Sequence, residues 1–179
     1  MEELSRNNPE KLLDVLCERL TFERAGVRIY DAIIAKLEAS NSIEVHRTLY
    51  AMHHYRDQEQ EHEKWLEARI RALGGDARAR TEHSVLVEKE AQGIESVILN
   101  GDNDPSHLFH ALLAAELSDH AGWELLVALA DEAGDRDAKR EFKKRLKQEA
   151  QHLEFVRKCV EGFACASVLG EPLEMPVAP

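Results

Sequence analysis

The sequence is poor in cysteine, proline and glycine, which argues against cysteine-based sites and against frequent breaks in helices. Its three cysteines, Cys17, Cys159 and Cys165, form no Cys-x-x-Cys pair. They therefore offer no disulfide framework, thiolate zinc site or rubredoxin-type iron centre, and we expect three idle thiols. Only five prolines and nine glycines occur in 179 residues. Because these residues interrupt helices, their scarcity leaves room for long ones.

Basic residues and long apolar runs are also scarce. The chain has 23 Lys and Arg against 34 Asp and Glu, a net charge of −11. Nucleic-acid binding needs a concentrated basic face, so we expect no nucleic-acid partner. The excess of acidic residues favours cations as ligands instead. No apolar run reaches the roughly 18 residues of a membrane span, and residues 1–8 are polar. We expect no membrane association and a cytoplasmic location.

What is present is a composition suited to amphipathic helices, with 44% apolar and 32% charged residues. Cap residues, prolines and glycines divide the chain into four long helices. The predicted helices run from Pro9 to about Ala39, from about Ile43 to Leu73, from Pro105 to near Gly134, and from Asp135 to about Ala166. The turns fall at Asn41-Ser42, at Gly74-Gly75 and at Gly134.

The 31 residues from Gly74 to Asp104 are too many for a tight turn. Within them, residues 85–99 have helical apolar spacing with a weak point at Gly93. We interpret this segment as a long crossover that contains a short helix, returns along the bundle and joins two antiparallel hairpins. The predicted fold is therefore an all-α four-helix bundle in one domain, residues 1–169, followed by an extended or disordered tail, residues 170–179.

Each predicted helix has an apolar seam in 3-4 spacing that is interrupted near its middle by residues that can bind metal. The interrupting residues are Glu23 on the first helix, Glu59 and His62 on the second, Glu116 and Asp119 on the third, and Glu149 and His152 on the fourth. In an antiparallel hairpin, two residues lie level when the turn is midway between them. The midpoint between Glu23 and the Glu59/His62 pair falls at Asn41-Ser42. The midpoint between Glu116 and the Glu149/His152 pair falls beside Gly134. We therefore expect the interrupting residues to meet at one height of the bundle.

Four buried glutamates would be prohibitively unfavourable without neutralising partners. Two divalent cations balance their charge, and Glu-x-x-His places both side chains on one helix face. The pairs Glu59/His62 and Glu149/His152 are the two occurrences of this motif in the sequence. We therefore predict two metal ions held by Glu23, Glu59, His62, Glu116, Glu149 and His152. Oxygen-rich coordination without thiolate favours iron, with manganese as the alternative.

This pattern resembles the ferritin-like di-iron carboxylate superfamily, which includes bacterioferritins and rubrerythrins. The resemblance implies terminal ligands at Glu23 and Glu116 and bridging ones at Glu59 and Glu149, which would carry the catalysis. It also implies an oxidoreductase that reacts Fe(II) with oxygen or peroxide and an electron donor that the sequence does not identify. The alternative is a non-catalytic iron-binding or stress-associated module. The sequence offers no cysteines for the four-cysteine domain of rubrerythrins, and its proline-containing tail does not resemble the fifth helix of cage ferritins, so we expect a smaller oligomer such as a homodimer and not a cage.

Asp119, a further cofactor-binding candidate, has two interpretations. The first is an extra metal ligand, as rubrerythrins have at this spacing, and the second is an acceptor that orients the ring of His62 or His152. We favour the second because the aspartate side chain is short. Tyr30, Tyr55 and Trp123 are interpreted as core residues with a polar tip, with a redox relay as the alternative.

Overall fold

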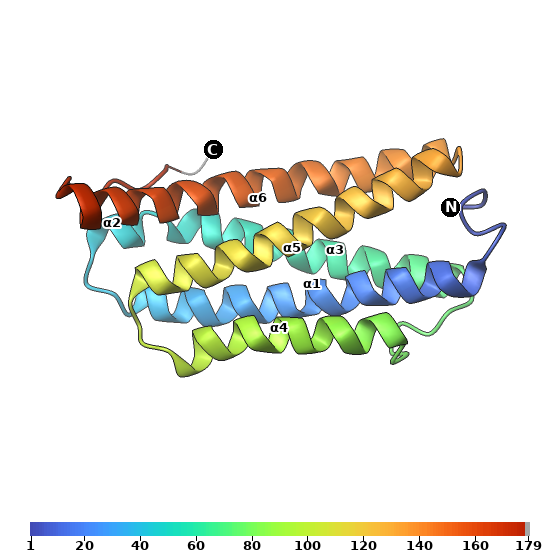
Figure 1. Ribbon diagram of the computed structural model, residues 1–179, viewed down its shortest axis with the longest axis horizontal. Coiled ribbons are helices and arrows are strands. Elements are labelled where there is room, and N and C mark those ends of the chain that lie inside the picture. Colours follow the sequence, from blue (N-terminus) through green and yellow to red (C-terminus); the bar gives the residue numbers. More distant parts are fainter. Residues whose placement is uncertain (178–179) are drawn as a thin grey trace.

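The computed structural model describes residues 1–177 and is all-α over that range (Figure 1). Its helices are α1 (Pro9–Glu38), α2 (Ile43–His46), α3 (Leu49–Ala72), α4 (Glu82–Asn100), α5 (Pro105–Glu132) and α6 (Arg136–Leu169). None of them is both long and apolar enough to cross a membrane. The prediction of an all-helical chain is confirmed.

The helix ends follow the capping chemistry that the sequence predicts. The side chains of Asn8, Asp104 and Asp135 each accept a hydrogen bond from a backbone N–H in the first turn of α1, α5 and α6. After α3 and α5 the chain turns at Gly74 and Gly134, whose φ angles of 80° and 68° lie in the left-handed region. Glycine adopts this conformation at little cost, which explains both positions.

The prediction of one continuous second helix from Ile43 to Leu73 is wrong. The segment begins as α2, breaks at Arg47-Thr48 and resumes as α3. Thr48 is fully buried, and its hydroxyl donates to the backbone carbonyl of Val45 at 2.7 Å. Ser42 caps α2 at its other end. Local side-chain to backbone bonds of this kind compete with the regular helical pattern, so α2 stays a separate short turn.

The crossover contains one helix, α4, which is longer than predicted and continues through Gly93. A side chain at Gly93 would meet nothing within 4 Å, so the residue lies on an open face. A glycine there costs the helix only about 1 kcal/mol. A capping box between Thr81 and Ser84 starts the helix.

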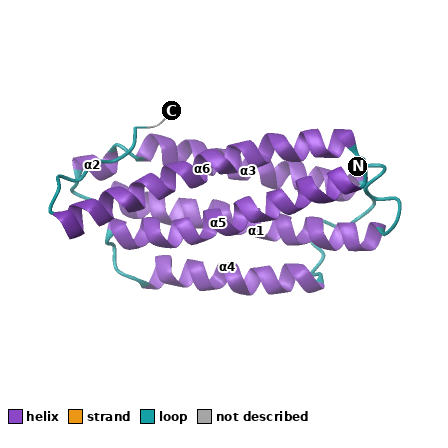
Figure 2. Ribbon diagram, turned by 45° about the horizontal axis from the view of Figure 1, so that its top comes forward, coloured by secondary structure: helices purple, strands orange, loops and turns teal. Residues whose placement is uncertain are grey.

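The four long helices form two antiparallel hairpins, α1 with α3 and α5 with α6 (Figures 1 and 2). Helix α4 lies outside them along α1 and also contacts α5. It runs in the same direction as α1 and carries the chain from the end of α3 to the start of α5 (Figure 1). The crossover therefore spans the length of the bundle, as its residue count required.

Two apolar clusters fill the bundle on either side of a polar layer. One cluster is centred on Tyr30, Phe109 and Val156, and the other on Leu16, Trp123 and Phe142. In the tail, residues 170–177 contain no helix, and a β-carbon on Gly162 of α6 would lie 2.4 Å from the carbonyl oxygen of Glu174. This part of the tail therefore packs closely against α6, whereas residues 178–179 of the predicted tail lie outside the described residues.

Candidate metal centre

The polar layer contains all seven candidate residues that the sequence singled out. They are Glu23 on α1, Glu59 and His62 on α3, Glu116 and Asp119 on α5, and Glu149 and His152 on α6. Each is between 0% and 3% exposed. Residues far apart in the chain thus converge at one height of the bundle, as the hairpin midpoints predicted.

The carboxylate and imidazole atoms form three overlapping groups whose members lie within 4.8 Å of one another. One group is Glu59, Glu116, Glu149 and His152, the second is Glu23, His62 and Glu149, and the third is Glu23, Glu59, Asp119 and Glu149. Each histidine belongs to a different group, and Glu149 belongs to all three. The layer therefore has two halves that share a central carboxylate, and buried Glu and His groups of this kind can hold metal ions.

Each histidine reaches across to the glutamate of the opposite motif. Nδ1 of His62 lies 2.7 Å from Oε1 of Glu149, and Nδ1 of His152 lies 3.1 Å from Oε1 of Glu59. The two rings are nearly parallel, with an interplanar angle of 17° and centroids 6.5 Å apart. Both imidazoles thus present the same nitrogen to the interior of the layer.

The other ring nitrogen of each histidine meets a glutamine that sequence reasoning missed. Nε2 of His152 lies 2.7 Å from Oε1 of Gln58, and Nε2 of His62 lies 3.0 Å from Oε1 of Gln148. An Nε2–H that donates to the amide oxygen leaves Nδ1 free as a metal ligand. The available signal was the matched position of the glutamines, each directly before the glutamate of its motif.

Two aromatic side chains hold the single glutamates of α1 and α5. Nε1 of Trp123 donates to Oε1 of Glu23 at 2.8 Å, and the hydroxyl of Tyr30 donates to Oε1 of Glu116. Each donor follows the glutamate of its own helix by seven residues and contacts the glutamate of the other helix. The pseudo-symmetry of the two glutamates therefore extends to the aromatic donors that orient them. The prediction that these residues are core residues with a polar tip agrees with this arrangement.

A buried arginine, also missed from the sequence, lies beside the layer. Nη1 of Arg19 is 3.5 Å from Oδ1 of Asp119 and donates to its backbone carbonyl at 3.2 Å. Nε of Arg19 is 3.8 Å from Oε1 of Glu23. A β-carbon on Gly122 would lie 1.5 Å from Nη1, so this glycine makes room for the guanidinium. The only signal in the sequence was the position of Arg19 one turn before Glu23.

The expectation that Asp119 orients a histidine is wrong. Both outer ring nitrogens contact glutamines, and Asp119 lies against Arg19 instead. The carboxyl group of Asp119 nevertheless belongs to one of the three potential ligand groups. Its role as an additional ligand therefore stays a prediction.

Burial and like charge dominate the protonation of the layer. Burial, followed by repulsion from neighbouring carboxylates, raises the pKa values of Glu59, Glu116 and Asp119 well above their usual range. Burial would also raise the pKa of Glu149, but the two imidazoles outweigh it and lower that pKa. Burial alone would lower the pKa of His62, but the adjacent carboxylates of Glu149 and Glu23 raise it well above its usual value. Without metal, the layer therefore retains protons that bound cations would displace.

Several buried polar atoms of the layer have no hydrogen-bond partner among residues 1–177, the part of the chain that the structure describes. They are one oxygen each of Glu23, Glu59, Glu116 and Asp119, both oxygens of Glu149, and Nδ1 of His62. Nδ1 of His62 lies 2.7 Å from Oε1 of Glu149, yet both atoms are among those without a hydrogen-bond partner. Unpaired buried groups are rare and unfavourable in native proteins. Bound cations would satisfy these atoms, which are concentrated on facing helices.

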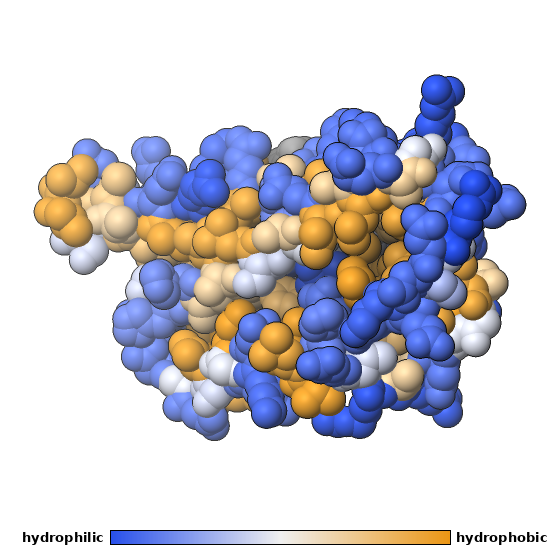
Figure 3. Space-filling view, turned by 45° about the vertical axis from the view of Figure 1, so that its right-hand side comes forward, coloured by the Kyte–Doolittle hydropathy of each residue, from blue (hydrophilic) through white to orange (hydrophobic). Residues whose placement is uncertain are grey.

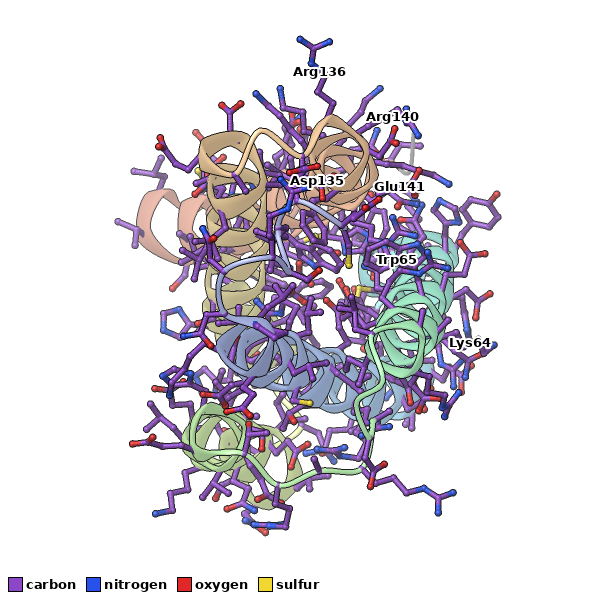
Figure 4. All side chains as sticks on the ribbon, turned by 90° about the vertical axis from the view of Figure 1, so that its right-hand side faces the viewer. Lys64, Trp65, Asp135, Arg136, Arg140 and Glu141 are labelled. Atoms are coloured by element: carbon purple, nitrogen blue, oxygen red, sulfur yellow. The ribbon has the colours of Figure 1, made fainter. Side chains whose placement is uncertain are left out.

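The surroundings of the layer are tightly closed. The β-carbon position of Gly26 lies 2.6 Å from Oε2 of Glu59, so only glycine leaves space for this carboxylate. At one end, Trp65, Trp123 and Phe142 form an aromatic layer with centroids 5.8 to 6.3 Å apart. The view along the bundle shows Trp65 directed inward from α3 and its neighbour Lys64 directed to solvent (Figure 4). Water is thereby kept away from the carboxylates on this side.

Comparison of the chain with protein families, curated proteins and solved structures finds no match. The feature of the chain that bears on its function is the buried layer of glutamates and histidines, which can hold metal ions inside an all-helical bundle.

Proposed function

We propose that this protein is a ferritin-like di-metal protein that binds two iron ions and oxidises Fe(II) with oxygen or peroxide. The observation that carries the proposal is the buried layer of four glutamates and two histidines, whose free ligand atoms face one another from four helices. Glu23 and Glu116 would be terminal ligands, and Glu59 and Glu149 would bridge the two positions. His62 would complete the ligand set of one half of the layer, and His152 that of the other half.

Charge balance supports two divalent ions. The layer contains five carboxylates, Glu23, Glu59, Glu116, Asp119 and Glu149, and the guanidinium of Arg19 offsets one of them. The remaining four negative charges equal the charge of two divalent cations. A buried site with this balance avoids the desolvation penalty of uncompensated carboxylates.

The donor set supports iron. Carboxylate oxygens outnumber imidazole nitrogens, and none of the three cysteines belongs to a potential ligand group within the described residues 1–177. Such a set suits Fe(II) or Mn(II) better than tetrahedral zinc. When bound, two Fe(II) ions supply two electrons, which with two protons reduce hydrogen peroxide to two water molecules or oxygen to hydrogen peroxide.

The protein's own residues would fix the geometry and restrict access. Trp123 and Tyr30 orient the terminal glutamates, and Gln58 and Gln148 fix the histidine tautomers. The apolar clusters on both sides exclude bulk water. With all six ligands at most 2% exposed, the layer suits small reactants such as oxygen and peroxide.

The same burial favours a second candidate, a non-catalytic iron-binding or stress-associated module. A layer closed on both sides can retain iron without rapid turnover. The two candidates differ in rate rather than in ligands, because both require the same six residues.

The test is to load the protein with Fe(II) without oxygen and then add oxygen or hydrogen peroxide. We expect ferric absorption to appear faster than in buffer, with one peroxide consumed per two Fe(II). Glu149→Ala should abolish this coupled oxidation, whereas Glu161→Ala, an exposed glutamate on the same helix, should not. Oxidation by Glu149→Ala at the parent rate would refute the site. Two bound irons that oxidise no faster than free iron would select the non-catalytic module.

A further inference from the structure

The outer side of α5 carries an apolar stripe that faces solvent. Leu117 and Leu125 are 48% and 49% exposed. Ala114, Ala121 and Ala128 are exposed on the same side of the helix. The space-filling view shows apolar side chains gathered in a band across this side of the molecule (Figure 3). Because the opposite side of α5 faces the core, the helix is apolar on both sides, which is typical of a helix with a partner on each.

The stripe is symmetric about Ala121. Leucines lie four residues before and after it, at 117 and 125, and alanines lie seven residues before and after it, at 114 and 128. Eight residues away on either side are two half-buried leucines, at 113 and 129. A helix that serves only its own core gains nothing from such symmetry on its exposed face.

We propose that α5 is the interface of a homodimer, in which two copies of this chain pack their α5 helices antiparallel about a two-fold axis at Ala121. A two-fold interface is self-complementary: if one residue contacts a second residue of the partner, the second residue of the first copy also contacts the first residue of the partner. In an antiparallel pair, residues equidistant from the axis come level. Leu117 is then level with the partner's Leu125, and Ala114 with the partner's Ala128.

The shapes of these side chains suit the pairing. At 100° per residue, Leu117 and Leu125 lie about 40° to either side of Ala121 on the helix surface. Across the axis they fall on opposite sides of the seam and interdigitate. Ala114, Ala121 and Ala128 lie within about 20° of the centre of the stripe, and their small side chains allow the two helices to approach to the short end of the usual 8 to 10 Å range.

The charges also select the antiparallel arrangement. Between Ala114 and Ala128 the exposed charged residue is Glu124, which lies about 60° from Ala121 at the edge of the stripe, so the leucines and alanines of the stripe are uncharged in a chain with a net charge of −11. At the ends of the stripe are His110 and Glu132, both exposed and each eleven residues from Ala121. Antiparallel packing places His110 beside the partner's Glu132, whereas parallel packing would place two glutamates together. Opposite charges at the rim fix register and orientation.

The experiment measures the molar mass of the metal-loaded full-length chain by sedimentation from about 1 to about 100 µM, the range in which a moderate dimer dissociates. We expect a dimer. The double variants Leu117→Glu/Leu125→Glu and Leu117→Lys/Leu125→Lys should each be monomeric, since like charges then meet across the axis. Mixing the two variants should restore a dimer, as should Leu117→Lys/Leu125→Glu in one chain. Leu86→Glu, at a leucine of α4 that is 53% exposed, is the control and should stay dimeric.

A covalent test checks the position of the axis. Ala121→Cys should form a disulfide-linked dimer on mild oxidation, because residue 121 faces itself, whereas Leu86→Cys should not. Every variant must retain its helical circular dichroism and its metal content, which separates loss of the interface from loss of the fold. A monomeric parent at all concentrations would overturn the proposal. So would an assembly that survives both like-charge variants, or a mixture of those variants that stays monomeric.

Discussion

Oε2 of Glu59 lies 2.6 Å from the point that a β-carbon on Gly26 would occupy. The two residues come from facing positions on α1 and α3, and Glu59 is a proposed bridging ligand. Any side chain on Gly26 would therefore push this carboxylate away from the centre of the layer. A glycine within a 30-residue helix, which propensity alone disfavours, thus has a specific reason to be there.

Gly26→Ala should weaken metal binding without unfolding the protein. The carboxylate end of Glu59 can move aside, so we expect metal affinity to fall about tenfold or more while the unfolding free energy of the metal-free protein changes by less than about 1 kcal/mol. Isothermal titration and urea unfolding measure the two quantities. Gly93→Ala, on the open face of α4, is the matched control and should stabilise the fold by about 1 kcal/mol with unchanged metal binding. Unchanged affinity in Gly26→Ala would show that Glu59 is not a ligand.

Replacing a glutamine that orients a histidine should reduce metal affinity. Gln58→Leu removes the acceptor of the Nε2–H of His152, so its ring loses the tautomer that presents Nδ1 to the metal. We expect a 10- to 100-fold loss of affinity, which is typical for partners of this kind. Gln148→Leu should act equally on the half that contains His62. Gln151→Leu, at an exposed glutamine of α6, should bind metal like the parent, and equal losses in all three variants would contradict the assignment.

The metal-free protein should be less stable near pH 7 than near pH 5.5. The pKa values of Glu59, Glu116 and Asp119 are raised in the folded state, so the folded protein binds more protons than the unfolded chain above the usual carboxylate range near 4. His62, whose pKa is also raised, adds to this trend above about pH 6.5. The lowered pKa of Glu149 acts in the opposite sense only below its ordinary value of 4.5.

Urea unfolding in the presence of a chelator measures this pH dependence, and saturating metal should reverse it, because cations compete with protons for the same ligands. Greater stability of the metal-free protein at pH 7 would show that the carboxylates are not buried together.

Arg19 and Asp119 should behave as a coupled pair. Arg19→Met leaves the carboxylate of Asp119 buried without its counter-charge and should lower the unfolding free energy by about 3 to 5 kcal/mol. Adding Asp119→Asn should recover part of that loss, so the two effects should not be additive in urea unfolding. Asp119→Asn alone should still bind two metal ions and change the rate or the preference between oxygen and peroxide. Loss of one ion in that variant would make Asp119 a ligand, and additive effects would mean that the pair is not coupled.

Sequence reasoning located the residues of the buried Glu/His layer because they obey local rules. Glu23 and Glu116 interrupt apolar seams, Glu-x-x-His repeats on two helices, and the turns at Asn41-Ser42 and Gly134 place these interruptions level. Capping residues and glycines set the ends of the long helices, and they are local signals as well. Each of these signals lies within a few turns of the residues it describes.

The features that escaped prediction depend on tertiary contacts. An arginine beside a seam is normally solvated, and Arg19 is buried because Gly122, about a hundred residues later, makes room for it. Gln58 and Gln148 contact histidines on opposite helices, which depends on how α3 and α6 are rotated relative to each other. The break at Thr48 is decided by burial and one hydroxyl bond, and the apolar pattern runs through it without a change.

The most direct test of the central claim is to count metal ions in the protein after Fe(II) is added without oxygen at neutral pH and excess iron is removed. The proposed layer predicts about two iron ions per chain, since four net negative charges and two Glu-x-x-His halves are available. The matched variant Glu161→Ala should give the same count, and Glu149→Ala should give a lower one. Fewer than one ion per chain in the parent protein would contradict the di-metal site.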